Sequence, residues 1–307
     1  MRVDMRYAKK NKPYTAKEFE NPTSEYRAAP FWSWNCKLEE KALRQDIAYF
    51  EEMGFGGFNM HPRDGLDTAY LSEEFMDAVR VCCEEAEKRG MLAYLYDEDR
   101  YPSGAAGGLV TKDPQYRTRY LYITEDKLEH ESEDAAISDG GVYFVSAYSV
   151  RLDSDGRILS YSRIGEDEDA EGRKIYAYSR TAALSPWHNG YTYLDTLNPK
   201  AVDRFIEVTH EAYKKHFGDR FGKTIPSIFA DEPQYKVGDT IKSGKDKIDY
   251  RLAFTPDIPE SFLAAKGYDF LDRLPEIFLG RADGILSKAR YDYHDHLCER
   301  FVSAYSD

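Results

Sequence analysis

The sequence predicts an α/β fold, the N-terminal part of a (β/α)8 barrel of the TIM type with a small antiparallel β insertion. Short apolar runs alternate with amphipathic helical patterns, four of these runs end in polar clusters, and β-prone runs interrupt the series after the third. In parallel α/β folds the functional groups lie at the carboxyl ends of the strands. The polar clusters are therefore the candidate site.

The first three barrel units are expected within residues 28–116, after an N-terminal arm at 1–27. Their strands should begin near Phe31, Gly57 and Leu92. The helix between the second and third strands has the clearest limits, because Ser72 suits an N-cap, two glutamates follow in the first turn, and Gly90 suits a C-terminus. This rhythm of strand and helix is typical of a parallel sheet.

An antiparallel insertion is expected at residues 117–195, where the strand–helix rhythm stops. Three β-prone runs lie there, at 142–152, 157–163 and 174–183. The first two runs are joined by Asp153-Ser154-Asp155-Gly156, which is typical of a hairpin turn. The acidic tracts beside these runs are interpreted as solvated loops.

The barrel is expected to continue over residues 196–307. Asn198-Pro199 suits a helix start, and the apolar run Ser227-Ile228-Phe229-Ala230-Asp231-Glu232-Pro233 is too short between its prolines for a helix, so it predicts the fourth strand. From Thr255 onward the pattern is helical, and no further buried strand is predicted. Four units rather than eight favour a chain that ends part-way through a barrel, whose missing C-terminal half would be its partner.

Composition narrows the classes of ligand. The formal charge of −13 argues against a nucleic acid or an anionic membrane as partner, and a neutral or cationic ligand fits better. Tyrosine occurs 25 times, and its flat rings suit sugar faces as well as core packing. No apolar run approaches the ~20 residues of a membrane span, and the first residues lack an export signal, so we expect a cytoplasmic protein. The four cysteines have no CxxC spacing, which predicts neither a structural disulfide nor a zinc site.

The strand ends supply the candidate binding residues. Trp32 and Trp34 alternate onto one face of the first strand, where they form either a floor for sugar stacking or part of the core. His61 and Arg63 follow the second strand. Carboxylates and arginine suit vicinal hydroxyls, although pairing of Arg63 or Arg100 with the acidic cluster is the alternative. That cluster follows the third strand and comprises Asp97, Glu98 and Asp99.

Four motifs together resemble the catalytic barrel of large bacterial glycoside hydrolases related to α-L-rhamnosidases, over roughly 28–307. The motifs are Phe31-Trp32-Ser33-Trp34-Asn35, Gly56-Gly57-Phe58-Asn59-Met60-His61-Pro62-Arg63, Tyr96-Asp97-Glu98-Asp99-Arg100-Tyr101-Pro102-Ser103-Gly104 and Phe229-Ala230-Asp231-Glu232-Pro233. In the broader clan A glycosidases the fourth strand ends in Asn-Glu-Pro, and its Glu is the general acid/base. The resemblance implies that role for Glu232, with Asp231 in place of the Asn.

We also expect sugar contacts from polar and aromatic residues of these motifs. They are Trp32, Trp34, Asn35, His61, Arg63, Asp97, Glu98, Asp99 and Tyr101. Asp231 and Glu232 are the candidate catalytic pair, because hydrolysis of a glycoside needs a carboxylic acid that donates a proton and the negative charge of Asp231 favours retention of that proton. The partner carboxylate is expected on a later strand, so the chain alone is expected to be inactive.

Two other classes of function stay open. The side chains of His61, Asp97, Glu98, Asp99, Asp231 and Glu232 could instead assemble a Mg²⁺ or Ca²⁺ site of a metal-dependent hydrolase or lyase. For the carboxylate mechanism no cofactor is expected. A barrel that binds carbohydrate without cleaving it is the third reading. The sugar and its linkage are not encoded in these motifs.

Overall fold

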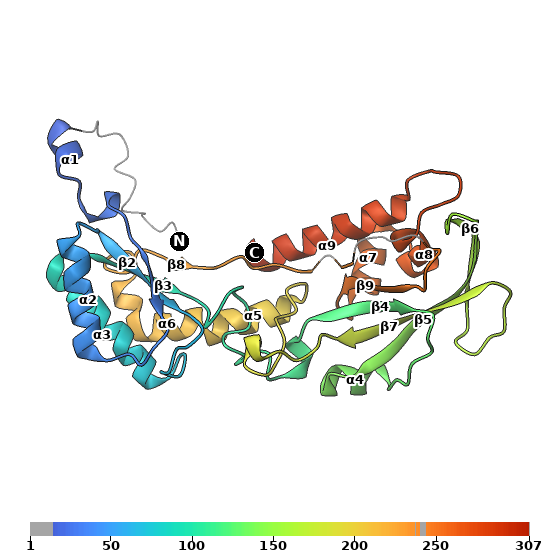
Figure 1. Cartoon of the computed structure of the whole chain (residues 1–307), viewed down its shortest axis with the longest axis horizontal. Helices are drawn as coiled ribbons and strands as arrows, with labels where there is room; N and C mark the ends of the chain where they lie inside the picture. The colour runs from blue at the N-terminus through green and yellow to red at the C-terminus, as the bar shows by residue number, and fades with distance from the viewer. Residues whose placement is uncertain (1–14, 237, 240–243, 307) are drawn as a thin grey trace. The chain divides into compact units, whose positions relative to one another are not determined.

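The chain folds into two compact units that contain one parallel and one antiparallel sheet (Figure 1). The computed structural model describes residues 15–236, 238–239 and 244–306. Unit 1 comprises Met1–Leu109 and Arg204–Pro233, and unit 2 comprises Val110–Asp203 and Gln234–Asp307. The finer division predicted above, at 27, 116 and 195, stays a prediction.

Unit 1 contains an open sheet of four parallel strands in the order β1-β2-β3-β8. The strands are β1 (Phe31–Trp34), β2 (Gly57–Pro62), β3 (Leu92–Tyr96) and β8 (Ile228–Phe229). The prediction of four adjacent parallel strands is confirmed. The sheet is not closed in the part of the chain that the structure describes, so the barrel remains a prediction. Strand β8 ends at Phe229, which leaves Asp231 and Glu232 on the segment beyond it.

Among the helices of unit 1, α3 (Glu73–Arg89) begins and ends where the sequence predicts. The others are α1 (Ala16–Glu20), α2 (Glu40–Glu52), α6 (His210–Phe217) and the second half of α5 (Pro199–Val208), with 3-10 turns at Ser24–Tyr26 and Gly218–Arg220. The Ser72 hydroxyl accepts a hydrogen bond from the Phe75 N–H at 3.2 Å, which caps α3. Gly90 ends α3 with φ 65°, a left-handed conformation that glycine adopts without a steric cost.

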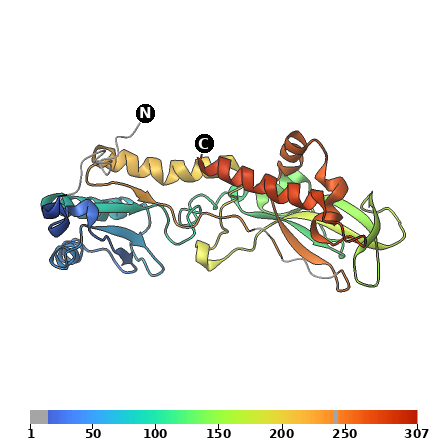
Figure 2. The ribbon, with the colours of Figure 1, turned by 90° about the horizontal axis from the view of Figure 1, so that it is seen from above.

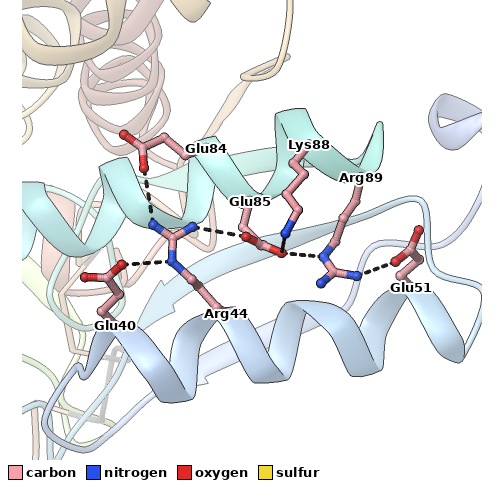
Figure 3. A network of polar contacts seen from close by, with 7 residues as sticks. All are labelled: Glu40, Arg44, Glu51, Glu84, Glu85, Lys88 and Arg89. Carbon is pink, nitrogen blue, oxygen red and sulfur yellow. Dashed lines mark hydrogen bonds and ion pairs between the residues drawn. The ribbon is translucent and has the colours of Figure 1, made fainter.

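Charged side chains connect α2 to α3 along their exposed edge (Figure 3). Arg44 of α2 donates to Glu40 at 2.9 Å on its own helix, and to Glu84 at 3.3 Å and Glu85 at 3.0 Å on α3. Glu85 also accepts from Arg89 at 2.7 Å. Glu85 is buried, and it is the only member of this group whose side chain is almost fully removed from water. Arg89 of α3 also donates to Glu51 of α2 at 2.5 Å, so several contacts join the two helices and Glu85 is their buried member.

The two faces of the parallel sheet differ in character. Alternate residues Trp34, Phe58, Met60, Ala93 and Leu95 are buried and pack against α2, α3 and α6. The opposite face carries Phe31, whose side chain is 57% exposed, and Phe229, which is 37% exposed. Strands β2 and β3 approach closely at Gly57, where a Cβ atom would lie 2.4 Å from the Leu92 carbonyl oxygen. Unit 1 therefore has a helix-covered face and a face with exposed rings.

Unit 2 contains a five-stranded antiparallel sheet in the order β6-β5-β7-β4-β9. Its strands are β4 (Arg119–Thr124), β5 (Val142–Leu152), β6 (Ile158–Ile164), β7 (Arg173–Thr181) and β9 (Asp249–Phe254). The three predicted β runs are confirmed as β5, β6 and β7. Strand β9, which pairs with β4 and ends just before Thr255, was not predicted. Its alternation of Tyr250, Leu252 and Phe254 with exposed or smaller residues is the signal that was missed.

Three C-terminal helices cover one face of this sheet (Figures 1 and 2). The helical elements of unit 2 are α4 (Glu133–Asp139), the first half of α5, α7 (Ile258–Lys266), α8 (Leu274–Phe278) and α9 (Lys288–Ser306), with 3-10 turns at Pro114–Tyr116, Pro186–His188 and Phe270–Arg273. The predicted helical end of the chain is confirmed, and Gly267 ends α7 with φ 80°. Phe262, Ile277 and Tyr293 of these helices share a core with Leu121 and Leu252 of the sheet. Among the described residues, no helix is long and apolar enough to cross a membrane.

Candidate functional site

Asp231 is the centre of the polar groups at the carboxyl edge of the parallel sheet. The Tyr96 hydroxyl, at the end of β3, donates to Asp231 Oδ2 at 2.9 Å. His61 Nε2, near the end of β2, lies 3.9 Å from the same oxygen. Because parallel strands end at one edge, side chains far apart in sequence meet there. The predicted approach of His61 to the end of the fourth strand is therefore observed for Asp231.

The backbone of Asp231 is fixed by Ser103. The Asp231 N–H donates to Ser103 Oγ at 2.8 Å, and the Ser103 N–H donates to the Asp231 carbonyl oxygen at 2.8 Å. Ser103 Oγ in turn donates to Asp97 Oδ1 at 2.5 Å. His210 Nε2, on α6, lies 2.9 Å from Asp97 Oδ2. A partly buried relay of polar groups thus determines where the segment after β8 lies.

Glu98 organises the loop that follows β3. Its carboxylate accepts four backbone N–H groups, from Asp99 at 2.9 Å, Gly104 at 2.9 Å, Ala106 at 2.7 Å and Gly107 at 2.5 Å. Burial raises the pKa of Glu98 to about 8, and the four donors act in the opposite direction. All four donors belong to the backbone of this loop. The Glu98 carboxyl group therefore stabilises the loop and is not available to a ligand.

His61 is a neutral imidazole at the pH of most cells. Burial lowers its pKa to about 4, Arg63 acts in the same direction, and Asp231 opposes them. Its ring packs against Tyr96, with centroids 3.9 Å apart, and against Phe31 at 5.0 Å. Its Nδ1 is buried and has no partner among the described residues. His61 therefore contributes a polar but uncharged surface beside Asp231.

Tyr96 keeps its proton and acts as a donor. Burial raises the pKa of its hydroxyl well above the usual value, and the hydrogen bond to Asp231 adds to the effect. The backbone of Tyr96 is also fixed, because the Tyr213 hydroxyl of α6 donates to the Tyr96 carbonyl oxygen at 3.0 Å. The donor that orients Asp231 is thus fixed by the helix layer.

Exposed aromatic rings lie beside these polar groups. Phe31 and Phe229 contact each other edge to face, with centroids 5.3 Å apart, and Phe229 stacks on Tyr96 at 6.1 Å. Tyr101 is also exposed, and the Arg63 guanidinium lies 5.9 Å from its ring centroid. Rings next to a carboxylate can contact the apolar face of a sugar while the carboxylate accepts from its hydroxyls.

Glu232 is exposed and lies directly after Asp231. Its φ of 47° is in the left-handed region, which non-glycine residues seldom adopt. Among the described residues it makes no hydrogen bond and no ion pair. A carboxyl group placed in this way is accessible to a ligand, whereas Asp231 beside it is held by Tyr96.

Several predicted binding residues occupy structural positions instead. Trp32 and Trp34 face the helix layer, where Trp32 contacts Phe50 and Trp34 contacts Phe75, so the core interpretation is right and the sugar floor is wrong. Asp97 is 0% exposed and Glu98 is 1% exposed, and both are engaged internally. Their burial follows from the loop 97–107 folding back over the strand end.

The remaining predicted residues lie around the same edge. Arg100 forms ion pairs with Asp64 at 3.2 Å and Asp99 at 3.3 Å, which confirms the alternative of structural pairing. Asp99 is buried, and Asn35 is exposed just after β1. Taken as a set, the residues that remain accessible to a ligand are Asn35, Arg63, Tyr101, Asp231 and Glu232.

Sequence reasoning missed five residues of this edge. They are Phe31, Tyr96, Ser103, His210 and Phe229. The alternation of side chains along a strand could have identified Phe31 and Tyr96. Phe31 is next to Trp32 and Tyr96 is next to Leu95, and the neighbours of a core residue in a strand face away from the core. Nothing local identifies His210, which reaches Asp97 from a helix 113 residues later. In the part of the chain that the structure describes, no group of three or more His, Cys, Asp or Glu side chains is arranged to hold a metal ion.

The comparisons with known proteins bear on the fold alone. No protein-family model matches the chain, and no curated protein matches its sequence. Among solved structures, the chain is similar to the rhamnosidase from Novosphingobium sp. PP1Y, with a TM-score of 0.54 and 12% sequence identity. The match covers 96% of this chain and 45% of that protein, so the chain spans less than half the length of the rhamnosidase. The chain thus has a mixed α/β fold similar to part of a glycoside hydrolase.

Proposed function

We propose that this chain carries the acid/base side of a glycoside hydrolase site at the carboxyl edge of its parallel sheet. The observation that supports the proposal best is the pair at the end of β8: Asp231 is oriented by Tyr96, and the accessible Glu232 follows it. The exposed rings of Phe31 and Phe229 provide an apolar surface beside them. The likeness of fold to a rhamnosidase agrees with this choice of class.

The two carboxyl groups have different roles in the proposal. Glu232 donates a proton to the glycosidic oxygen, because it is accessible and not engaged with neighbouring side chains. Asp231 accepts a hydrogen bond from a sugar hydroxyl, because Tyr96 holds only one of its oxygens. Neutral His61 lines the site without attracting the negative end of the ligand. General acid catalysis of this kind supplies ~10² to 10⁴ in rate.

A complete reaction needs a second carboxyl group to attack the sugar or to activate water. Asp97 and Glu98 are engaged in internal hydrogen bonds and cannot take this part without loss of the loop. We expect the partner carboxylate on a later strand of a complete barrel. The chain alone should then bind a sugar, and it should cleave a glycoside only when a nucleophile is supplied.

An azide rescue experiment tests the proposal. Azide would form the bond to the anomeric carbon, while the aryl group leaves with the proton from Glu232. We expect the 307-residue chain to convert phenyl glycosides, rhamnosides included, to glycosyl azides only with azide present. Glu232→Gln should reduce that rate ~100-fold. Glu52→Gln, which changes an exposed carboxylate of α2, is the matched control and should have no effect.

Binding distinguishes the catalytic proposal from a carbohydrate-binding barrel. Ligand-observed NMR with the parent monosaccharides should show binding that Asp231→Asn weakens and Glu52→Gln does not. Binding without azide turnover would overturn the catalytic role and favour a non-catalytic site. If no sugar binds, or if Asp231→Asn binds as the wild type does, the whole proposal is wrong.

A further inference from the structure

A pocket lies on the antiparallel sheet of unit 2, away from the core of that unit. Leu121 and Ile123 of β4 face the core. Tyr120 and Tyr122, which alternate with them along the strand, face the opposite side. The pocket has a volume of about 630 Å³, which is within the usual size of a small-ligand site. It is lined by Tyr120, Tyr122, Arg180, Thr181, Ala182, Ala183, Asp239, Asp249 and Arg251.

Tyrosine rings and guanidinium groups alternate across the floor of the pocket. In the sheet register Tyr120 pairs with Arg180 of β7, and Tyr122 pairs with Arg251 of β9. Each arginine leans diagonally, so that the Arg180 guanidinium lies 5.8 Å from the Tyr122 ring centroid and that of Arg251 lies 5.7 Å from Tyr120. These cation–π contacts fix the planes of the guanidinium groups and keep their N–H groups available at the edges.

The two arginines differ in their polar partners. Arg251 donates to Asp239 from Nε at 3.2 Å and from Nη2 at 3.1 Å, so it is paired. Arg180 is exposed and makes no hydrogen bond or ion pair through its side chain with any other described residue. Two carboxylates, Asp239 and Asp249, nevertheless line the same pocket. Because the Arg180 guanidinium makes no ion pair with either carboxylate, its N–H groups are available to a ligand.

The charges of the pocket select the class of ligand. Two guanidinium and two carboxylate groups balance, so the lining has no net charge. An anion would meet Asp239 and Asp249, and a cation would meet Arg180 and Arg251. A neutral ligand with many hydroxyl groups can instead donate to the carboxylates, accept from the guanidinium groups and place its C–H surface against the rings.

We propose that this pocket in unit 2 binds a neutral carbohydrate. It would be a site separate from the one around Asp231 in unit 1. The inference does not rest on the proposed function, because all of its residues belong to unit 2 and none takes part in the polar groups around Asp231. A site of this kind would retain a chain of sugars independently of any bond cleavage.

Titration with short neutral oligosaccharides tests the proposal. Xylo-, manno-, cello- and galacto-oligosaccharides are added to the 307-residue chain, and binding is followed by calorimetry and by the NMR signal of the Arg180 side-chain Nε–H. We expect at least one of them to bind and to shift that signal. Arg180→Ala and Tyr122→Ala should each weaken binding about tenfold, which corresponds to ~1.4 kcal/mol.

Matched variants separate the pocket from other causes. Arg151→Ala removes an exposed arginine from β5 of the same sheet, outside the pocket, and should leave binding unchanged. The Arg180 Nε–H signal reports on this pocket alone, so failure of the proposed hydrolase function would not be confused with failure here. Arg180→Lys retains the charge but loses the planar donor, and we expect it to weaken binding as Arg180→Ala does.

Three outcomes would overturn the inference. The first is that no neutral oligosaccharide binds. The second is that binding is the same in Arg180→Ala, Tyr122→Ala and Arg151→Ala. The third is that only oligogalacturonates bind, because a ligand with carboxylate groups would contradict the charge balance of the lining. Circular dichroism of each variant confirms that the sheet is intact before binding is compared.

Discussion

Neighbouring acidic residues at the strand ends of unit 1 have different surroundings. Asp97 and Glu98 are buried and hold the loop after β3, whereas Glu232 is exposed and makes no polar contact with other described residues. The sequence indicates that acids follow these strands, but not which of them face inward. That distinction depends on how the loop 97–107 folds back, and its four N–H groups converge on Glu98 only in three dimensions. The sequence therefore predicts where the polar edge lies. It does not predict which of the acidic residues hold the loop and which remain accessible to a ligand.

The protonation of His61 is the most direct test at this scale. Because burial and Arg63 lower its pKa to about 4, the folded chain resists protonation at a pH where the unfolded chain, with a pKa near ~6.5, accepts a proton. The contribution of His61 to the free energy of unfolding should be complete above pH ~6.5 and should decrease as the pH falls towards 4. Imidazole NMR signals report the pKa directly. His61→Asn should remove this part of the pH dependence.

A histidine outside the site provides the control for this experiment. His216 lies on α6 outside the site, and His216→Asn is the matched variant with which the acid limb of His61→Asn is compared. A pKa near 6.5 for His61 would contradict the burial on which its neutral role depends.

The elements of the fold differ in how clearly the sequence predicts them. Helix α3 has a capping serine, acidic first-turn residues and a terminal glycine, and each feature is observed. Strands of the parallel sheet were found because apolar runs ended sharply in polar residues. Strands β4 and β9 were missed because their partners lie far away in the sequence, and because β9 follows a segment that was assigned to the barrel. Short-range patterns thus identified the elements, while the grouping into sheets depended on long-range pairing.

The contacts between α2 and α3 give the prediction at the scale of elements. Burial opposes ionisation of Glu85, yet hydrogen bonds from Arg89 and Arg44 lower its pKa below the usual value (Figure 3). Glu85→Gln removes one charge from a group of three cations and leaves donors of both helices without a carboxylate. We expect the free energy of unfolding to fall by about 1–3 kcal/mol, as measured by urea denaturation.

Glu84→Gln is the matched control, since it changes the next residue along α3. Glu84 is more exposed and makes one contact of 3.3 Å with Arg44. Its replacement should cost about 0.5 kcal/mol or less. Equal effects of the two substitutions would show that burial of Glu85 does not determine the strength of this network.

On the scale of the molecule, two hydrophobic cores of the described residues are each built from residues of one unit. The core around Trp34, Phe58 and Phe75 belongs to unit 1, and the core around Leu121, Phe262 and Tyr293 belongs to unit 2. The sequence predicted an insertion within a barrel. In the structure, β4 to β7 lie in one unit with β9 and the C-terminal helices, because their apolar faces pack against each other.

Separate cores lead to a final prediction about unfolding. Trp34→Ala should remove a large side chain from the core of unit 1, and Phe262→Ala should do the same in unit 2, each at a cost of ~3–5 kcal/mol. Hydrogen exchange followed by mass spectrometry can locate the loss of protection. We expect Trp34→Ala to speed exchange in β1, β2 and β3, and Phe262→Ala to speed exchange in β4, β7 and β9. Phe31→Ala, on the exposed face of β1, is the control and should change exchange little. If either core substitution speeds exchange equally in both sheets, the two cores unfold as one, and the division into units has no energetic meaning.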